Sequence, residues 1–591
     1  MKLRNKFSRF VVLYLLVGVF FAVVAGRLFF LQVQSAQESG KKIDSMLSLS
    51  ENDPAPRGDI CDRNGKVLAG NRKGYLVLIK KGEKAHLALT VKNLAQYENI
   101  EYMELLFKMQ EGGFGQNTPF VFSEDASDDL VTKIMESPED FPCVQIVTRP
   151  VRDYLYPETA VHLLGRCGVI SAEEYSTRTG YSRDDYIGKQ GAEKAFEEIL
   201  RGTDGRRAKE KYTQSGTMKF TEDVAPVKGK NVFLTIDMDL QTNAEEALDA
   251  QVKTNSASGG GAFVAVEINS GEVLALASNP TYNINDFNEN YTALAKDPKK
   301  PFFNRSISGL YEPGSTFKPV TAIAAMESGV LSPQEKIKTL GKYEYYNHTF
   351  RCNIYRERGK THGTIDVRDA LSVSCNYFFY ELGHRTGIDK IADTAYAFGL
   401  GTPTGIELTA EEATGRVATP QNRRMRGGYW YAGDTLQASI GQSDNLFTPI
   451  ALANYAAALS NGGTLYRARV LRGVEKSDGS LEYTKPEVLN KIEISPETLR
   501  AVRQGMIEVT TTGTAAEIFR DFPITVAGKT GSAQVGGRTN GLFIGFAPAD
   551  NPEIAFCAVI EGASSGNNAA KAAKNVLSYY FNIQQKGTMA Q

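Results

Sequence analysis

Apolar strand-like runs near residue 260, and again near residue 550, are the clearest pattern along this chain. Residues 262–268 and 272–278 are almost wholly apolar, and a short turn containing a glycine joins them. Residues 542–547 and 554–560 repeat the pattern, with prolines in the connection between them. Short apolar runs bounded by turn residues are typical of buried strands, so each pair predicts an antiparallel hairpin.

Helical patterns lie between the two strand pairs. The segment 315–329 is rich in alanine and β-branched residues, with Pro319 where a first turn tolerates it and Gly329 where a helix would end. A second helical run extends over 367–380. A hairpin, then helices, then further strands indicate an α+β domain with an antiparallel sheet.

The N-terminus carries an apolar run of a different kind. Residues 10–31 contain one charge, Arg27, and would span about 33 Å as a helix, enough to cross a bilayer. Four basic residues precede this run, which predicts a cytoplasmic tail at 1–9, a transmembrane signal anchor at 10–31 and an extracytoplasmic remainder. A cleaved signal peptide is the alternative, because 23–25 loosely resembles a cleavage site.

The rest of the chain divides into two predicted parts and a tail. Residues 50–250 mix short strands with charged helical stretches, have a hairpin-turn signal at Asn64, and hold no cluster of catalytic type. His162 there is interpreted as a structural histidine. We therefore expect a non-catalytic pedestal or dimerisation module at 50–250, a catalytic domain at 256–582, and a disordered tail at 583–591.

Composition narrows the possible functions. The 591 residues are 42% hydrophobic and 23% charged, which suits a globular protein of several domains. A formal net charge of -1 gives no basic field for nucleic acid. The cysteines form no C-x-x-C pair and the histidines no metal-binding spacing, so we expect neither a metal site nor a cofactor. Cys352 and Cys375 are the nearest candidates for a disulfide, although free buried thiols are favoured.

Ser315 and Lys318 are the candidate nucleophile and base. A spacing of three residues on a helix places the hydroxyl and the amine on one face. Burial lowers the pKa of an amine, so a buried lysine can act as a base towards a serine. Ser39 and Lys42 match the same pattern, but they lie in a charged stretch and are interpreted as a chance match. This pairing is typical of serine acyl-transfer enzymes.

A second serine and an asparagine follow in the apolar run 367–380. Ser374 and Asn376 are favoured because their surroundings could hold a hydroxyl rigidly against a buried lysine. Ser443, followed by an aspartate and an asparagine, is a competing match, but it lies in a segment that reads as a loop entering a helix. Weaker serine-x-asparagine matches occur at Ser50 and Ser565.

A third motif comprises Lys529, Thr530 and Gly531, in a strand-like context. A lysine and a hydroxyl on a strand supply a cation and a donor for a carboxylate. The glycine lets a substrate backbone lie alongside as an added strand.

These three motifs together resemble those of the class B penicillin-binding proteins, the monofunctional D,D-transpeptidases of peptidoglycan synthesis. The stretches 311–318 and 374–378 are similar to that family's first two motifs, and 57–65 to its N-terminal signature. Ser532 stands where threonine is commoner, and Gln534 where glutamate often follows. The resemblance implies a serine β-lactamase-like catalytic domain on an elongated mixed α/β pedestal.

The resemblance also implies a mechanism. Ser315 would attack the penultimate D-alanine of a stem peptide ending in D-Ala-D-Ala, with Lys318 as general base and Ser374 as proton relay. A second stem peptide's amine would then complete the cross-link, and β-lactams would acylate the same serine. The implied substrate-binding residues are Asn376, Lys529, Thr530, Gly531 and Ser532.

Other functions remain open at this point. Water as the acceptor would make the protein a D,D-carboxypeptidase or a β-lactamase, and a protein lacking catalysis would be a β-lactam sensor or a scaffold. Residues 40–250 show no sign of a glycosyltransferase domain, so we expect a separate membrane glycosyltransferase as partner.

Overall fold

The computed structural model describes most of the chain beyond residue 51. The described residues are 52–112, 114–115, 119–182, 185–206, 210–212, 218–220, 224–255, 259–535 and 537–583, with positions 18, 21 and 27. The predicted anchor at 10–31 lies outside them except for those three positions, and the predicted tail lies outside them beyond residue 583. Across the described residues, no helix combines the length and hydropathy that a membrane crossing requires.

The chain forms two compact units. Among the described residues, the first lies within 52–56, 73–150 and 202–228, and the second within 57–72, 151–201 and 229–583. In the first unit, Leu94, Leu105 and Leu130 are buried with residues of the neighbouring strands. Its main elements are α3 (Lys84–Tyr97), α4 (Tyr102–Glu111), β4 (Phe120–Ser123) and α5 (Asp128–Glu136), with parts of β3 (Val67–Ile79) and β5 (Val144–Tyr154).

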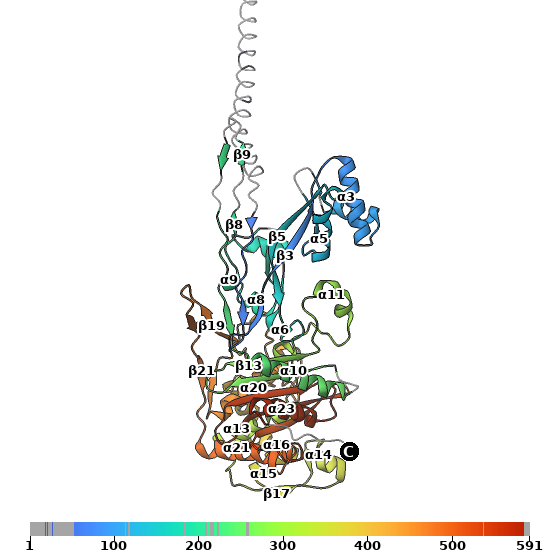
Figure 1. Ribbon diagram of the computed structural model, residues 1–591. Helices are drawn as coiled ribbons and strands as arrows, with labels where there is room; N and C mark the ends of the chain where they lie inside the picture. The colour runs from blue at the N-terminus through green and yellow to red at the C-terminus, as the bar shows by residue number, and fades with distance from the viewer. Residues whose placement is uncertain are drawn as a thin grey trace, which may run out of the picture. The chain divides into compact units, whose positions relative to one another are not determined.

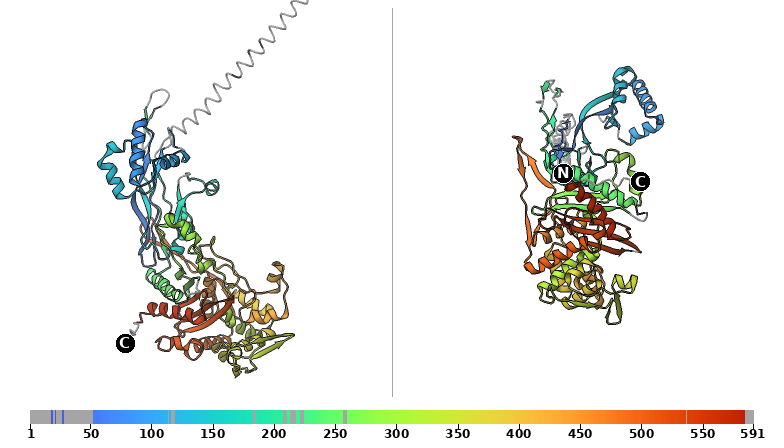
Figure 2. Two further views of the ribbon diagram at one scale, coloured as in Figure 1. Left: turned by 90° about the vertical axis from the view of Figure 1, so that its right-hand side faces the viewer. Right: turned by 60° about the horizontal axis from the view of Figure 1, so that its bottom comes forward.

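A five-stranded antiparallel sheet is the centre of the second unit. Both predicted hairpins are confirmed, and the first strand of the N-terminal hairpin pairs with the last strand of the chain. Elements far apart in sequence therefore lie side by side, as the green and red segments show (Figure 2). The strand order is β13 (Val273–Asn279), β12 (Gly261–Glu267), β24 (Ile554–Ile560), β23 (Arg538–Ala547) and β22 (Ala527–Val535).

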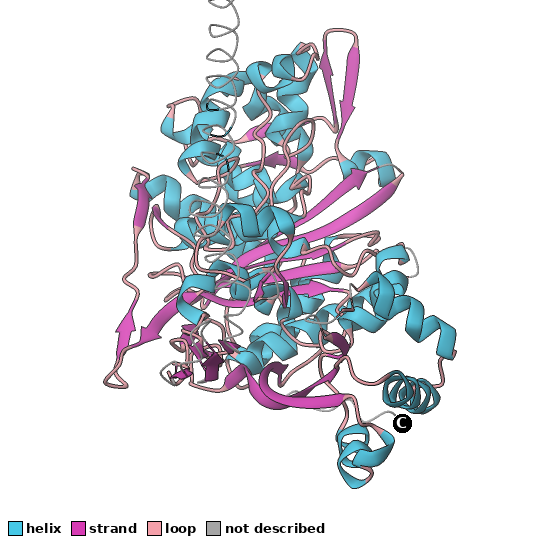
Figure 3. Ribbon diagram, turned by 90° about the horizontal axis from the view of Figure 1, so that it is seen from above, coloured by secondary structure: helices cyan, strands magenta, loops and turns pink. Residues whose placement is uncertain are grey.

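Helices cover both faces of this sheet (Figure 3). On β12, Ala262 and Val264 contribute to one hydrophobic cluster, while Phe263 and Ala265 contribute to another. This alternation is the two-residue period of a strand buried on both sides. The α10 (Met238–Lys253) and α23 (Gly566–Tyr580) helices pack on one face, and α20 (Pro449–Ser460) packs against β12 and β24 (Figure 1).

A helical layer carries two of the sequence motifs. Its central helix is α13 (Lys318–Glu327), in which every residue from Lys318 to Met326 is buried. It packs against α16 (Asn376–Thr386) and α17 (Ile388–Ala397), while α15 (Val367–Ser372) packs against α21 (Pro496–Thr511) and α19 (Ala432–Ser439) against α16. This architecture confirms the predicted α+β class with an antiparallel sheet flanked by helices.

Two predicted helices differ from the structure. The segment 315–329 begins as a 3₁₀ turn, η3 (Gly314–Phe317), before α13 starts at Lys318. The run 367–380 is broken between α15 and α16, where Ser374 has φ +55°. A left-handed residue cannot continue a helix, and the apolar pattern on either side hides the break.

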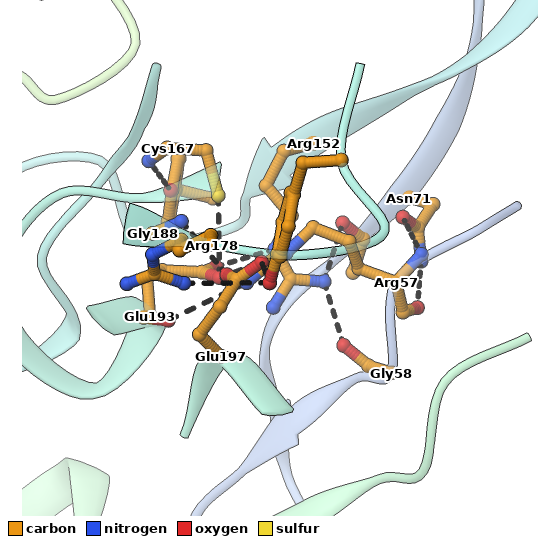
Figure 4. Close-up of polar contacts among 12 residues, drawn as sticks. Arg57, Gly58, Asn71, Arg152, Cys167, Arg178, Gly188, Glu193 and Glu197 are labelled. Atoms are coloured by element: carbon orange, nitrogen blue, oxygen red, sulfur yellow. Dashed lines mark hydrogen bonds and ion pairs between the residues drawn. The ribbon is translucent and has the colours of Figure 1, made fainter. Parts of the chain in front are cut away.

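Charged residues in the 50–250 region form a buried cluster within the second unit (Figure 4). Glu193 accepts from Arg57 Nη2 at 2.8 Å and from Arg152 Nε at 2.5 Å, and Cys167 Sγ donates to it at 3.3 Å. Glu197 forms a second ion pair with Arg57 at 2.8 Å. Buried charges of this kind are tolerated because they are paired, so we interpret the cluster as structural.

The turn predicted at Asn64 is confirmed between β2 (Ile60–Cys61) and β3. Further elements include β11 (Val232–Leu234), α11 (Phe287–Lys296), α12 (Arg305–Ser308), β14 (Ile337–Thr339), β15 (Lys342–Tyr345), β16 (His348–Arg351), α14 (Asn353–Arg358), β17 (Gly363–Ile365), α18 (Pro420–Met425), β18 (Thr464–Tyr466), β19 (Leu471–Glu475), β20 (Leu481–Tyr483), β21 (Val488–Lys491) and α22 (Ala516–Phe519).

Candidate active site

Ser315 lies in a turn that backbone contacts hold in place. The Gly314 N–H donates to the Gly441 carbonyl at 2.9 Å, and the Thr316 hydroxyl donates to the Pro313 carbonyl at 2.8 Å. Gly314 has φ +52°, and a Cβ there would come within 3.0 Å of the Ser532 carbonyl oxygen. This turn therefore sits directly against β22, with the half-buried Ser315 at its start.

Lys318 is fully buried and contacts the second motif. Its Nζ donates to the Ser374 carbonyl at 2.8 Å, to Asn376 Oδ1 at 2.6 Å and to Ser374 Oγ at 3.2 Å. The left-handed backbone at Ser374, between α15 and α16, presents both its carbonyl and its hydroxyl to this one amine. The first two motifs are thus directly hydrogen-bonded to each other.

Lys529 reaches the same hydroxyl from the sheet. It is fully buried on β22, and its Nζ donates to Ser374 Oγ at 3.0 Å and to the Thr530 carbonyl at 3.0 Å. The Ser374 hydroxyl therefore lies between two amines that come from different layers of the fold.

Electrostatics make it unfavourable for both amines to carry a proton. Burial lowers the pKa of Lys318 to about 8. Burial also lowers the pKa of Lys529 well below its usual value, and the charge of Lys318 lowers it further. Two like charges around one hydroxyl cost free energy, so one of the two amines readily loses its proton. Ser374 can then accept a hydrogen bond from the charged amine and donate one to the neutral amine.

The β22 strand is an open edge of the central sheet. It pairs with β23 from Ala527 to Val535, and the described residues add no strand on its other side. A Cβ at Gly531 would lie 2.7 Å from the Pro313 carbonyl and 2.9 Å from Thr316 Cγ2, so glycine permits the strand to approach the Ser315 turn. An extended peptide can pair with such an edge as an added strand.

Two hydroxyls flank Gly531 along this edge. Thr530, which is 9% exposed, has its Oγ1 2.7 Å from that of Thr514. Ser532 is exposed, and its Oγ accepts from the Gly566 N–H at 3.1 Å. Together with the buried Lys529 they give the strand edge beside Ser315 one amine and two hydroxyls, which are donors that suit an anionic group.

The competing serine at 443 has a different environment. Its hydroxyl accepts from Arg423 at 2.8 Å, and the adjacent Asp444 pairs with Arg423 at 2.6 Å and with Arg426 at 2.6 Å. Asn445 is buried and holds backbone groups, accepting from the Ala418 N–H at 2.9 Å. These contacts fix a loop and include neither Lys318 nor Lys529.

The structure also assembles a group of metal-binding side chains beside the second motif. Cys352, His362 and Cys375 place their donor atoms within 4.8 Å of one another. The two sulfurs are 4.0 Å apart and unbonded, so the disulfide alternative is wrong in this structure. Hydrogen bonds from Cys375 and His362 lower the pKa of Cys352 below that of an ordinary thiol.

Two sulfurs and an imidazole are the donors that zinc prefers, so these three residues could hold a thiophilic divalent ion. Sequence spacing did not identify them because the three are separated by intervals of ten and thirteen residues. The one hint in the sequence is Cys375, which lies inside the second motif, between Ser374 and Asn376.

Comparison with known proteins agrees with these features. A family model described as the penicillin binding protein transpeptidase domain matches residues 261–578, and one described as the penicillin-binding protein dimerisation domain matches residues 52–234. Peptidoglycan D,D-transpeptidase MrdA from Acinetobacter baumannii is 29% identical over 97% of this chain and 87% of its own length.

Solved structures show the same similarity. A complex between the penicillin-binding protein PBP2 and MreC from Helicobacter pylori has a TM-score of 0.79 at 24% identity, covering 90% of this chain and 99% of that one, and so supports the fold. A structure of a peptidoglycan synthase complex that coordinates polymerization and crosslinking has a TM-score of 0.72 at 26% identity, covering 98% of this chain and 100% of that one.

Proposed function

Because this chain belongs to the class B penicillin-binding proteins, the monofunctional peptidoglycan D,D-transpeptidases, we propose that Ser315 is the nucleophile with which it cross-links stem peptides. Ser315 attacks the carbonyl of the penultimate D-alanine in a peptide ending D-Ala-D-Ala. The last D-alanine leaves, and the rest of the peptide remains as an ester on Ser315.

The proton path runs through the contacts between the first two motifs. Neutral Lys318 takes the Ser315 proton as the general base. Ser374, which is hydrogen-bonded to Lys318 and to Lys529, passes a proton to the leaving amine. The single observation that carries this proposal is the convergence of both buried amines on Ser374 Oγ, at 3.2 and 3.0 Å.

The groove along β22 binds the substrate. Lys529 supplies positive potential, and Thr530 and Ser532 hydrogen-bond the terminal carboxylate. Gly531 keeps the strand edge open to the peptide backbone, and Asn376 hydrogen-bonds a substrate amide. The proximity of the Gly314 turn to the Ser532 carbonyl supports this arrangement.

The oxyanion of the tetrahedral intermediate is stabilised by two backbone N–H groups, those of Ser315 and Ser532. Donors positioned in this way lower a barrier by about 3–4 kcal/mol. The same two donors would stabilise the oxyanion formed from a β-lactam, whose strained carbonyl acylates Ser315. The carboxylate of the β-lactam would then occupy the site of the peptide's terminal carboxylate.

The domain organisation and the location of the protein are proposed from its membership of this family. A signal anchor at 10–31 holds the protein in the cell membrane with its catalytic domain at 256–582 outside, and the module at 50–250 is non-catalytic. The partner is a membrane glycosyltransferase that polymerises glycan strands. Similarity to a subunit of a peptidoglycan synthase complex supports this pairing.

A two-substrate assay tests the function. Purified protein is given a labelled pentapeptide ending D-Ala-D-Ala and a second peptide with a free side-chain amine. We expect a covalent cross-linked dimer and released D-alanine. Release of D-alanine with only hydrolysed peptide would instead identify a D,D-carboxypeptidase, and no release would favour a sensor or scaffold.

A further inference from the structure

The Thr530 hydroxyl forms a hydrogen bond with Thr514, a residue outside the three motifs. Thr514 Oγ1 lies 2.7 Å from Thr530 Oγ1, and either atom could be the donor. Thr514 belongs to the connection that follows α21, and its side chain is exposed where that of Thr530 is nearly buried. Thr514 thus lies on the exposed side of Thr530, next to the proposed carboxylate site.

The loop that carries Thr514 is fixed by the two elements that form the site. Its N–H donates to the Ser372 carbonyl at 3.3 Å, at the end of α15 and two residues before Ser374. A Cβ at Gly513 would lie 2.4 Å from that same carbonyl, so the loop packs there without room for a side chain. The Thr510 hydroxyl donates to the Val526 carbonyl at 2.5 Å, which ties α21 to the start of β22.

The direction of the shared hydrogen bond has a chemical consequence. A hydroxyl has one proton to donate and two lone pairs with which to accept. If Thr530 gave its proton to Thr514, it would have none for a substrate carboxylate. If Thr514 donates to Thr530, the Thr530 proton points elsewhere, and the chain of two hydroxyls strengthens its donation.

We propose that Thr514 is a positioning residue for the transpeptidation site: its hydroxyl donates to Thr530 and orients the Thr530 proton towards the substrate's terminal carboxylate. This rests on the proposed function, in which Thr530 binds that carboxylate. Thr514 thereby sets the preference of the enzyme for substrates that end in a free carboxylate.

The test compares two substitutions of Thr514 with two probes. Thr514→Val removes the hydroxyl and keeps the shape, while Thr514→Ser keeps the hydroxyl. Each full-length protein is reacted with a penicillin that has a free carboxylate and with the methyl ester of the same penicillin. The second-order rate constant for acylation is followed by intact-protein mass spectrometry. Thr511→Val is the matched control, because Thr511 is an exposed threonine that donates only to the Ile507 carbonyl of its own helix, at 3.2 Å.

We expect Thr514→Val to slow acylation by the free acid about tenfold, as for loss of one hydrogen bond serving a charged group, and to leave the ester's rate unchanged. Thr514→Ser and Thr511→Val keep the wild-type rates. Adding Thr514→Val to Thr530→Val produces no further loss, since both act through one proton.

Two results would overturn the proposal. If Thr514→Val slowed acylation by the acid and the ester equally, Thr514 would have only a structural role. If it did not slow acylation by the acid, Thr514 would not orient the Thr530 proton. Failure of the proposed function is measured separately, because wild-type protein would then form no cross-linked dimer in the two-substrate assay, whatever the acylation rates of the Thr514 variants.

Discussion

The amines of Lys318 and Lys529, both fully buried, lie within hydrogen-bond distance of one oxygen, Ser374 Oγ, at 3.2 and 3.0 Å. One comes from the first residue of a helix and the other from the edge strand of the sheet. The hydroxyl between them connects the two layers of the fold.

The first prediction concerns pH. Burial lowers the pKa of Lys318 to about 8, and only the neutral amine can accept the Ser315 proton. Raising the pH through this value converts the ammonium into the free base, so the rate of Ser315 acylation by penicillin should rise from pH 7 to pH 9. A rate that is flat or falls over this interval would remove Lys318 as the base.

The second prediction separates Ser374 from its competitor. Both Ser374 (φ +55°) and Ser443 (φ +66°) occupy the left-handed region, where glycine avoids a strain of about 1 kcal/mol. Ser374→Gly should therefore fold normally but lose acylation by about 10²–10⁴-fold, because the relay hydroxyl is gone. Ser443→Gly, measured in the same assay and by thermal unfolding, should keep the wild-type rate. Equal rates in the two variants would contradict the assignment.

A third prediction tests the close approach of β22 to the Ser315 turn. Gly531→Ala would place a methyl group 2.7 Å from the Pro313 carbonyl and force the strand away. We expect about a hundredfold loss of acylation, since small displacements of reacting groups cost that much. Gly70→Ala is the control, because its Cβ would meet neighbours only at 3.7 Å, an ordinary contact. A Gly531→Ala variant that is acylated at the wild-type rate would mean that β22 can accommodate a methyl group at this position.

A fourth prediction concerns the cluster of Cys352, His362 and Cys375. We expect the protein, purified without chelator, to carry a stoichiometric thiophilic ion such as Zn²⁺, measured by elemental analysis. Cys352→Ser should abolish the signal, whereas Cys557→Ser, at a buried free cysteine outside this cluster, should not. Folded wild-type protein that contains no such ion by elemental analysis would contradict a metal site at these residues.

Much of the arrangement was predictable because local patterns encode it. The apolar runs of β12, β13, β23 and β24 are long and bounded by turn residues, so strands and hairpins could be predicted from the sequence alone. The three motifs have recognisable residues in a recognisable order, so the sequence alone predicts Ser315, Lys318 and Lys529 as site residues.

Other features depend on tertiary contact and leave no local pattern. The break at Ser374 interrupts a run that is apolar on both sides, so periodicity predicted one continuous helix. Thr514 is a single threonine in a polar connection, and only the packing of Gly513 on Ser372 brings it to Thr530. His362 lies ten residues from Cys352, a spacing that is not typical of a metal-binding motif.

The most direct test of the central claim is labelling with a fluorescent penicillin. Wild-type protein, Ser315→Ala and Ser39→Ala are compared on a denaturing gel, since Ser39 is the other serine with a lysine three residues later. The account predicts strong labelling of the wild type and of Ser39→Ala, and none of Ser315→Ala. Labelling that persists in Ser315→Ala would contradict the assignment of Ser315 as the nucleophile.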